Sequence, residues 1–166
     1  MNLALKLKNL FTKKSNTECV DICVVSSCGG HLTEVNKLYA AFSRYKHIYI
    51  VNDKINLTKE QSQLYHFVTH SERDLKFFLN LFEFYILFKR FRPTVILSTG
   101  AGPIVPATMV AKYVFKSEII YIETITRLNE LSLTGKIMYY MADEFYCQWP
   151  AQVAKYKKAK LLGPML

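Results

Sequence analysis

The sequence lacks any run of about 20 apolar residues, although 51% of its 166 residues are hydrophobic. A single helix needs about that length to cross a bilayer, so we expect no membrane-spanning helix. Lys6 and Lys8 interrupt the apolar start of the chain, which disfavours a cleavable signal peptide. Internal repeats and low-complexity segments are also missing, and the length fits one domain with a substantial core.

Paired cysteine spacing is absent as well. Cys19, Cys23, Cys28 and Cys147 form no C-x-x-C pair, so we interpret them as reduced, mostly structural residues of a cytosolic protein. The sequence contains no Asp-x-Asp pair and no His-Glu-x-x-His motif. A metal-dependent mechanism therefore has no support, and we expect neither a metal nor another cofactor.

Acidic residues are few, with 13 Asp and Glu against 22 Lys and Arg, and the net charge is +9. This charge fits nucleic acid, an anionic bilayer surface or a phosphorylated substrate equally well. The basic clusters form no stacking platform and no nucleic-acid motif, so we expect no nucleic-acid partner. The clusters are Lys6, Lys8, Lys13 and Lys14; Lys89, Arg90 and Arg92; and Lys155, Lys157, Lys158 and Lys160.

Short apolar runs alternate with helical patterns along most of the chain. This alternation predicts an α/β fold, a Rossmann-like doubly wound parallel sheet with helices on both faces, over residues 17–166. The expected strands are 20–25, 47–51, 65–68, 94–98, 118–122, 144–147 and 160–162, and the expected helices are 32–44, 73–91, 104–116 and 131–141.

The amino-terminal segment has the pattern of an amphipathic helix. Leu3, Leu7, Leu10 and Phe11 share one stripe at helical spacing, and lysines flank that stripe. Such a helix lies in a membrane interface or packs against its own domain. We assign residues 1–16 to a membrane-associating helix and linker, which predicts a peripheral protein on the cytoplasmic face of the membrane.

The expected helix at 73–91 has almost no polar face. A helix that is apolar all round must be covered by something. It is either a central helix buried against the sheet or a second surface for a membrane or a partner. In the second case Lys89, Arg90 and Arg92 would reach anionic headgroups.

Two glycine-rich loops follow expected strands. Adjacent glycines let the backbone approach an anion closely, and the N-terminus of a following helix favours negative charge. In the usual strand order 3-2-1-4-5, both loops flank one crevice at the carboxyl edge of the sheet. The expected ligand is a nucleotide, a pyrophosphate or a phosphorylated lipid. The predicted binding residues of the loops are Ser27, Gly29, Gly30, Thr99, Gly100, Ala101 and Gly102.

Titratable side chains are expected at the same edge. His31 follows the first loop, and the strand at 118–122 delivers Glu123 and Arg127. We predict that either His31 or Glu123 is a general base and that the other orients the acceptor or stabilises charge, with Arg127 as a binding residue. The alternative for Glu123 and Arg127 is a solvated loop with a local salt bridge. Glu34 fits the first turn of a helix, where carboxylates suit the dipole.

Four motifs together resemble a known family. They are Ser26-Ser27-Cys28-Gly29-Gly30-His31 with Glu34, Ser98-Thr99-Gly100-Ala101-Gly102-Pro103, Ile122-Glu123-Thr124-Ile125-Thr126-Arg127 and Leu162-Gly163-Pro164-Met165-Leu166. This set resembles the acceptor-side subunit of split bacterial glycosyltransferases, the capsule and exopolysaccharide proteins of the PssD, CpsF and EpsE kind. It is similar to the membrane-anchoring subunit of the eukaryotic dolichol-linked N-acetylglucosaminyltransferase and to the amino-terminal half of the peptidoglycan lipid-linked N-acetylglucosaminyltransferase.

The resemblance implies the amino-terminal half of a GT-B glycosyltransferase, which binds a lipid-diphosphate-linked saccharide acceptor. A partner polypeptide would hold the UDP-sugar, and the chain would be active only with that partner. Gly29, Gly30 and His31 would then lie near the acceptor diphosphate together with the second loop, and Glu123 near the acceptor sugar. Many relatives use a full hydrophobic span, whereas this chain offers only a short amphipathic helix.

Two other functions compete with this interpretation. Asp53, at the end of the second strand, would suit the ribose hydroxyl of a dinucleotide, but the first loop lacks the third glycine of G-x-G-x-x-G. A non-catalytic adaptor of the same sugar-transfer complex would share both the fold and the partner.

Overall fold

The computed structural model describes residues 19–52, 58–59, 61–69 and 76–165. The predicted membrane-associating segment, residues 1–16 with Leu3, Leu7, Leu10 and Phe11, lies outside the described residues, and so does Asp53.

The described residues form a seven-stranded sheet in the order β3-β2-β1-β4-β5-β6-β7. All neighbouring strands are parallel. The expected order 3-2-1-4-5 is confirmed, and with it the doubly wound α/β fold. The strands are β1 (Ile22–Ser26), β2 (His47–Val51), β3 (Tyr65–Phe67), β4 (Val95–Ser98), β5 (Glu118–Ile122), β6 (Glu144–Cys147) and β7 (Lys160–Leu161).

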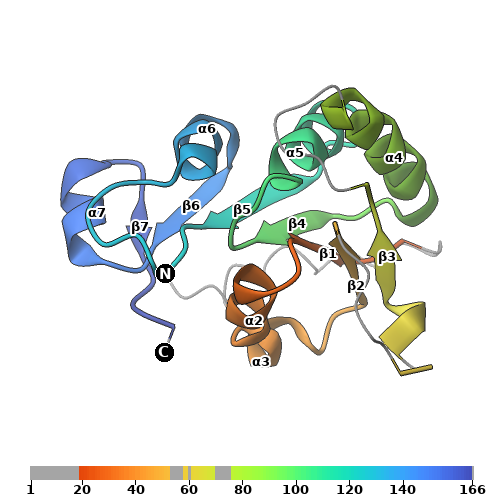
Figure 1. Cartoon of the computed structure of the whole chain (residues 1–166), viewed down its shortest axis with the longest axis horizontal. Helices are drawn as coiled ribbons and strands as arrows, with labels where there is room; N and C mark the ends of the chain where they lie inside the picture. The colour runs from red at the N-terminus through yellow and green to blue at the C-terminus, as the bar shows by residue number, and fades with distance from the viewer. Residues whose placement is uncertain (1–18, 53–57, 60, 70–75, 166) are drawn as a thin grey trace.

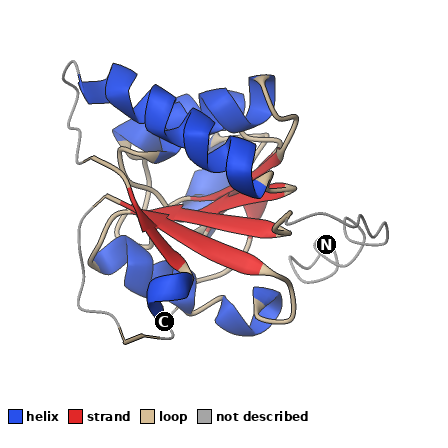
Figure 2. Ribbon diagram, turned by 90° about the vertical axis from the view of Figure 1, so that its right-hand side faces the viewer, coloured by secondary structure: helices blue, strands red, loops and turns tan. Residues whose placement is uncertain are grey.

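Helices cover both faces of the sheet, with α4, α5 and α6 on one side and α2 and α3 on the other (Figure 1; Figure 2 shows the layers edge on). Strands β1, β2, β4, β5 and β6 are almost entirely buried because both of their faces are covered, whereas β3 is only partly buried and β7 is exposed. The helices are α2 (Gly30–Asn36), α3 (Tyr39–Phe42), α4 (Lys76–Phe91), α5 (Ile104–Tyr113), α6 (Leu133–Met141) and α7 (Pro150–Lys155), with a 3₁₀ turn, η1 (Gln61–Gln63).

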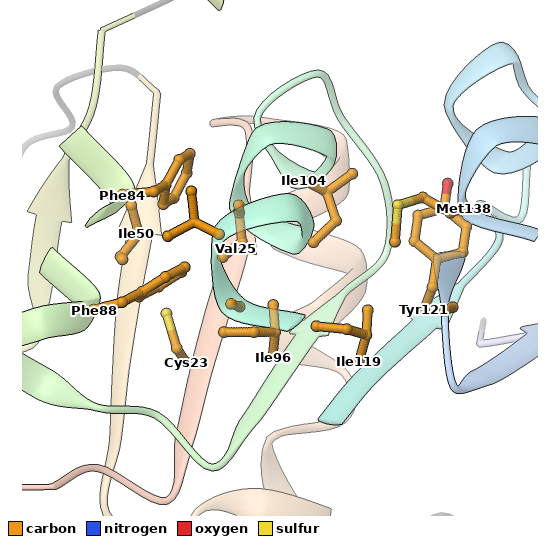
Figure 3. Close-up of a cluster of buried hydrophobic side chains, with 14 of the residues drawn as sticks. Cys23, Val25, Ile50, Phe84, Phe88, Ile96, Ile104, Ile119, Tyr121 and Met138 are labelled. Atoms are coloured by element: carbon orange, nitrogen blue, oxygen red, sulfur yellow. The ribbon is translucent and has the colours of Figure 1, made fainter. Parts of the chain in front are cut away.

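The sheet separates two hydrophobic clusters. Alternate residues of β1 point to opposite faces, so Cys23 and Val25 join one cluster while Ile22 and Val24 join the other. Figure 3 shows the first cluster, in which Phe84 and Phe88 of α4, Ile104 of α5 and Met138 of α6 lie against the sheet. The second cluster includes Leu32 and Val35 of α2 and Phe42 of α3.

The helix predicted over 32–44 is wrong in its bounds. It begins at Gly30 and is interrupted after Asn36, so that α2 and α3 are separate. At the interruption the amide of Lys37 donates to the Glu34 carbonyl and that of Leu38 to the Val35 carbonyl. These three-residue spacings are the tighter 3₁₀ pattern, which often ends a helix.

Helix α4 is buried on one side and exposed on the other. Phe84 and Phe88 are fully buried, whereas Phe78, Leu79 and Phe82 are 67%, 56% and 64% exposed. The sheet therefore covers only part of this apolar helix. None of the helices in the described ranges combines the length and apolarity needed to cross a membrane.

Candidate functional site

The loop after β1 requires glycine at its centre. Gly29 has a φ of +103°, in the region that side chains rarely adopt, and α2 starts at the next residue. A Cβ atom on either Gly29 or Gly30 would meet nothing within 4 Å, so the backbone here borders open space. The amide of Cys28 donates to Asn52 Oδ1 at the end of β2 over 3.3 Å, which connects the loop to the neighbouring strand.

The loop after β4 packs against His31. Gly100 has a φ of +129°, and a Cβ atom there would lie 2.7 Å from His31 Cε1. The hydroxyl of Thr99 donates to the His31 carbonyl over 2.8 Å, and His31 Nδ1 lies 3.1 Å from the Thr99 carbonyl. The two loops are thus connected in both directions, as the expected strand order predicts. Ala101 also has a positive φ, +86°, which is strained for a residue with a side chain.

These contacts indicate which nitrogen of the neutral His31 ring carries the proton. A carbonyl oxygen only accepts hydrogen bonds, so Nδ1 must carry the proton in the neutral ring. Nε2 is then left as a proton acceptor. The side chain is 31% exposed and lines a cavity, so this atom belongs to a ring that a ligand can reach.

The cavity lies at the carboxyl edge of the sheet and has a volume of about 640 Å³. Loops after β1, β4 and β5 form its walls, and the backbone of Met165 approaches from the carboxyl-terminal segment. Two cations, Lys37 and Arg127, border it. The lining residues are Ser27, Cys28, Gly30, His31, Thr33, Glu34, Lys37, Ala101, Thr124, Ile125, Thr126, Arg127, Ser132, Thr134 and Met165.

Most of the predicted site residues gather here. Ser27, Gly30, His31, Ala101 and Arg127 line the cavity. Gly29, Thr99, Gly100 and Gly102 belong to the same two loops without lining it. Lys37 was not predicted, because its position seven residues after Gly30 is separated from the loop in sequence by the whole of α2.

Glu123 does not reach the cavity, contrary to the expected placement. Its side chain is fully buried, and Oε1 accepts from the Thr124 amide over 3.0 Å. Oε2 accepts from both the amide and the hydroxyl of Ser132, each over 3.1 Å. Burial raises the pKa of this carboxyl above its usual value, and these hydrogen bonds oppose that shift. Ser132 also caps α6, since its Oγ accepts from the Gly135 amide.

Glu34 lines the cavity instead. Its side chain is buried, and Oε1 accepts from the Ile125 amide over 2.7 Å and from Gln148 Nε2. Oε2 lies 3.9 Å from His31 Nδ1. The prediction that Glu34 lies in the first turn of a helix is wrong, because α2 begins at Gly30 and has no acidic residue in its first turn. The sequence did contain a signal for this placement. Glu34 follows His31 by three residues, and residues three apart on a helix share a face.

No group of three or more His, Cys, Asp or Glu side chains in the described part of the chain is placed to hold a metal ion.

The fold is that of several solved proteins. It is similar to UDP-GlcNAc 2-epimerase from Methanocaldococcus jannaschii, with a TM-score of 0.64 and 10% identity over 86% of this chain and 45% of that one. For S. aureus MnaA, solved with UDP, the TM-score is 0.65 and the identity 10%, over 88% of this chain and 45% of that one. For MurG from Acinetobacter baumannii, the TM-score is 0.61 and the identity 11%, over 79% of this chain and 41% of that one. This chain spans less than half of each, and its fold is the Rossmann-like half of a GT-B protein.

The family follows from the sequence itself. A family described as "Oligosaccharide biosynthesis protein Alg14 like" matches residues 75–165, and the chain belongs to that family. The human UDP-N-acetylglucosamine transferase subunit ALG14 is 29% identical over 88% of this chain and 83% of its own length. The subunit of the same name from Schizosaccharomyces pombe is 40% identical over 43% of this chain and 36% of its own length. The family resemblance predicted from the motifs is confirmed.

Proposed function

We propose that this chain is the acceptor-binding, membrane-recruiting subunit of a two-component UDP-sugar glycosyltransferase. In this proposal it extends a polyprenyl-diphosphate-linked saccharide in capsule or exopolysaccharide biosynthesis. The observation that carries the proposal is the cavity whose lining combines His31, held by the two interlocked loops, with two cations, Lys37 and Arg127. The family relatives named as UDP-N-acetylglucosamine transferase subunits support the reaction class.

The cavity suits an acceptor that carries both a diphosphate and a sugar. Lys37 and Arg127 are its two cations, and phosphate oxygens accept hydrogen bonds from such groups. The hydroxyl-bearing residues Thr33, Thr126 and Thr134 line the same space and can bond sugar hydroxyls. We assign Gly29, Gly30, Gly100 and Gly102 to shaping the loops that surround the diphosphate.

The chemistry needs a base for the attacking hydroxyl. The acceptor oxygen forms a bond to the anomeric carbon of the UDP-sugar, the bond from that carbon to the diphosphate breaks, and UDP leaves. His31 Nε2 accepts the proton released by the hydroxyl. Loss of a general base typically lowers the rate by about 10²–10⁴-fold. We assign His31 to this role and Glu123 to fixing the start of α6 beside it.

The UDP-sugar belongs on a partner polypeptide in this proposal. The described residues form one Rossmann-like unit that spans less than half of each solved structure it resembles, and the relatives are named as transferase subunits. Holding both substrates together is what makes the transfer effectively intramolecular. The partner therefore faces the carboxyl edge of the sheet, where the cavity opens.

The exposed side of α4 is the proposed second membrane contact, beside the predicted segment at residues 1–16. Phe78, Leu79, Phe82 and Ile86 are more than half exposed, a larger apolar surface than a solvated helix needs. Lys89 and Arg90 end the helix. Their charge complements an anionic cytoplasmic leaflet, which favours a membrane over a neutral protein surface as the occupant.

The decisive experiment is reconstitution with the donor-binding partner, UDP-GlcNAc and a short-chain lipid-diphosphate saccharide. We expect transfer by the pair and a fall of about 10²-fold or more in His31→Ala, with the complex intact by gel filtration. If His31→Ala and Glu123→Gln both turn over within about threefold of the parent, this chain is a non-catalytic adaptor and the base lies on the partner.

A further inference from the structure

We infer that Glu34 is the positioning residue of the site: while the Thr99 carbonyl orients the His31 ring, the fixed Glu34 carboxylate stabilises, from 3.9 Å, the charge that the ring acquires when Nε2 takes the acceptor proton. The inference rests on the proposed function, because it gives His31 the role of base. It adds a residue for which the sequence had predicted only a place in the first turn of a helix.

The carboxylate of Glu34 is fixed by two donors on other segments. Oε1 accepts from the Ile125 amide in the β5–α6 loop and from Nε2 of Gln148 at the end of β6. Gln148 is itself fully buried and has one orientation, since Nε2 also donates to the Glu123 carbonyl over 2.9 Å. Its Oε1 accepts from the Met165 amide over 2.8 Å.

Because Oε1 is occupied, Oε2 is the oxygen left for His31, at 3.9 Å from Nδ1. The ring already directs Nδ1 at the Thr99 carbonyl over 3.1 Å. When Nε2 accepts a proton the ring becomes a cation, and its other nitrogen lies beside a carboxylate that needs no rearrangement. Fixed charge of this kind is most effective where water is excluded, and the Glu34 side chain is only 7% exposed.

The other charges at the cavity act in the opposite sense. Lys37 and Arg127 are cations, so they repel further positive charge in the cavity and cannot compensate a ring that has taken up a proton. Among the described residues that line the cavity, Glu34 is the one acidic side chain. Glu34 is therefore the residue that can stabilise a cationic His31 ring in a cavity that also contains Lys37 and Arg127.

The variant Glu34→Gln distinguishes the proposed role of Glu34 from a purely structural one. The amide oxygen of the new side chain still accepts from Ile125 and Gln148, while the charge next to His31 disappears. We expect kcat of the reconstituted complex to fall by about 10- to 100-fold, with the KM for acceptor within about twofold and an unchanged thermal melt. Glu130→Gln, on an exposed carboxylate outside the cavity lining, is the matched control and keeps the parent kcat.

Three results overturn the inference. If Glu34→Gln turns over like the parent while His31→Ala is slow, Glu34 has no positioning role and the proposed function stands. If the parent complex transfers no sugar, the proposed function fails and the role of Glu34 fails with it. Nitrogen chemical shifts of the His31 ring provide a test that needs neither activity nor the variant. We expect Nδ1 protonated and Nε2 bare in the neutral ring, and the opposite tautomer contradicts the geometry.

Discussion

At the scale of single residues, Gly100 shows how closely the two loops fit. The His31 ring occupies the space that a side chain at position 100 would need, and the φ of +129° adds strain for any other residue. Replacing this glycine therefore displaces the proposed base and distorts the loop at the same time.

We predict that Gly100→Ala lowers turnover of the reconstituted complex by about 10²-fold, in line with loss of a general base, and destabilises the fold by about 1–3 kcal/mol. Kinetics and thermal melting measure the two effects. Gly30→Ala is the control for stability, because a Cβ atom there meets nothing within 4 Å and alanine favours a helix. Its melting temperature should equal or exceed that of the parent.

The buried carboxyl of Glu123 predicts a dependence of stability on pH. Burial raises its folded-state pKa above the ordinary value of 4.5, so the folded state binds this proton more tightly than the unfolded state. The stability that the group contributes is complete below the unfolded pKa and is lost as the pH rises through the folded pKa.

We therefore expect the free energy of unfolding of the parent, minus that of Glu123→Gln, to decrease as the pH rises from about 4.5. Urea denaturation of both proteins across that range measures the difference, and carboxyls common to the two cancel. A difference that grows with pH would contradict the assignment of burial as the dominant cause of the shift.

At the scale of elements, α4 has one buried side and one exposed apolar side. Phe84 and Phe88 belong to the core, while Phe78 and Phe82 stand exposed about one turn apart on the other side. We predict that Phe78→Ser with Phe82→Ser weakens co-sedimentation with anionic vesicles and leaves the thermal melt near that of the parent.

Tyr39→Ser is the matched control, since Tyr39 is an exposed aromatic residue on α3, which covers the opposite face of the sheet. Vesicle binding that is lost in the control as well would indicate a nonspecific effect of surface apolarity. Binding that survives the α4 variant but not Leu7→Glu with Leu10→Glu would assign attachment to the amino-terminal segment.

The strands were the part of the fold that the sequence predicted well. Runs such as 119–122 and 145–147 are apolar and buried at every position because both faces of the sheet are covered there, and turn residues mark their ends. Helix α7 was missed because six residues are too few for a helical period to emerge. The interruption of α2 was missed because it depends on backbone hydrogen bonds and not on a breaking residue.

The candidate site was predicted in its loops but not in its carboxylates. Glycine pairs after strands identify a crevice from spacing alone. Whether Glu123 or Glu34 borders that crevice depends on how the β5–α6 loop folds back. In the structure the Ser132 hydroxyl donates to the Glu123 carboxylate, which keeps that side chain buried. No local pattern in the sequence encodes that contact.

At the scale of the whole molecule, the described residues form a single sheet with a cavity at its carboxyl edge, and the sequence carries a net charge of +9. We predict that the isolated chain transfers no sugar and that adding the donor-binding partner restores transfer. Robust transfer from UDP-GlcNAc to a lipid acceptor by the isolated chain would contradict this.

The net charge also predicts that membrane attachment weakens with salt. Each lysine near anionic lipid contributes on the order of 1 kcal/mol, and the screening length falls from about 10 Å at 0.1 M salt to about 3 Å at 1 M. Co-sedimentation with anionic vesicles should therefore decrease across this range, and should be weak at any salt with neutral vesicles. Attachment that does not change with salt would indicate apolar contacts alone.

The reciprocal pair between His31 and Thr99 has a consequence for biogenesis. The two residues are 68 positions apart, so the pair forms only after β4 has been synthesised and has docked beside β1. Strands β1 to β3 emerge from the ribosome first, and an intermediate built from them alone contains the first loop without its support. If the cavity binds the acceptor as proposed, the growing chain acquires that ability late, after the non-local closure of the sheet, which is slow in parallel topologies. Nascent chains that end before β4 are expected to leave lipid-linked saccharides unsequestered.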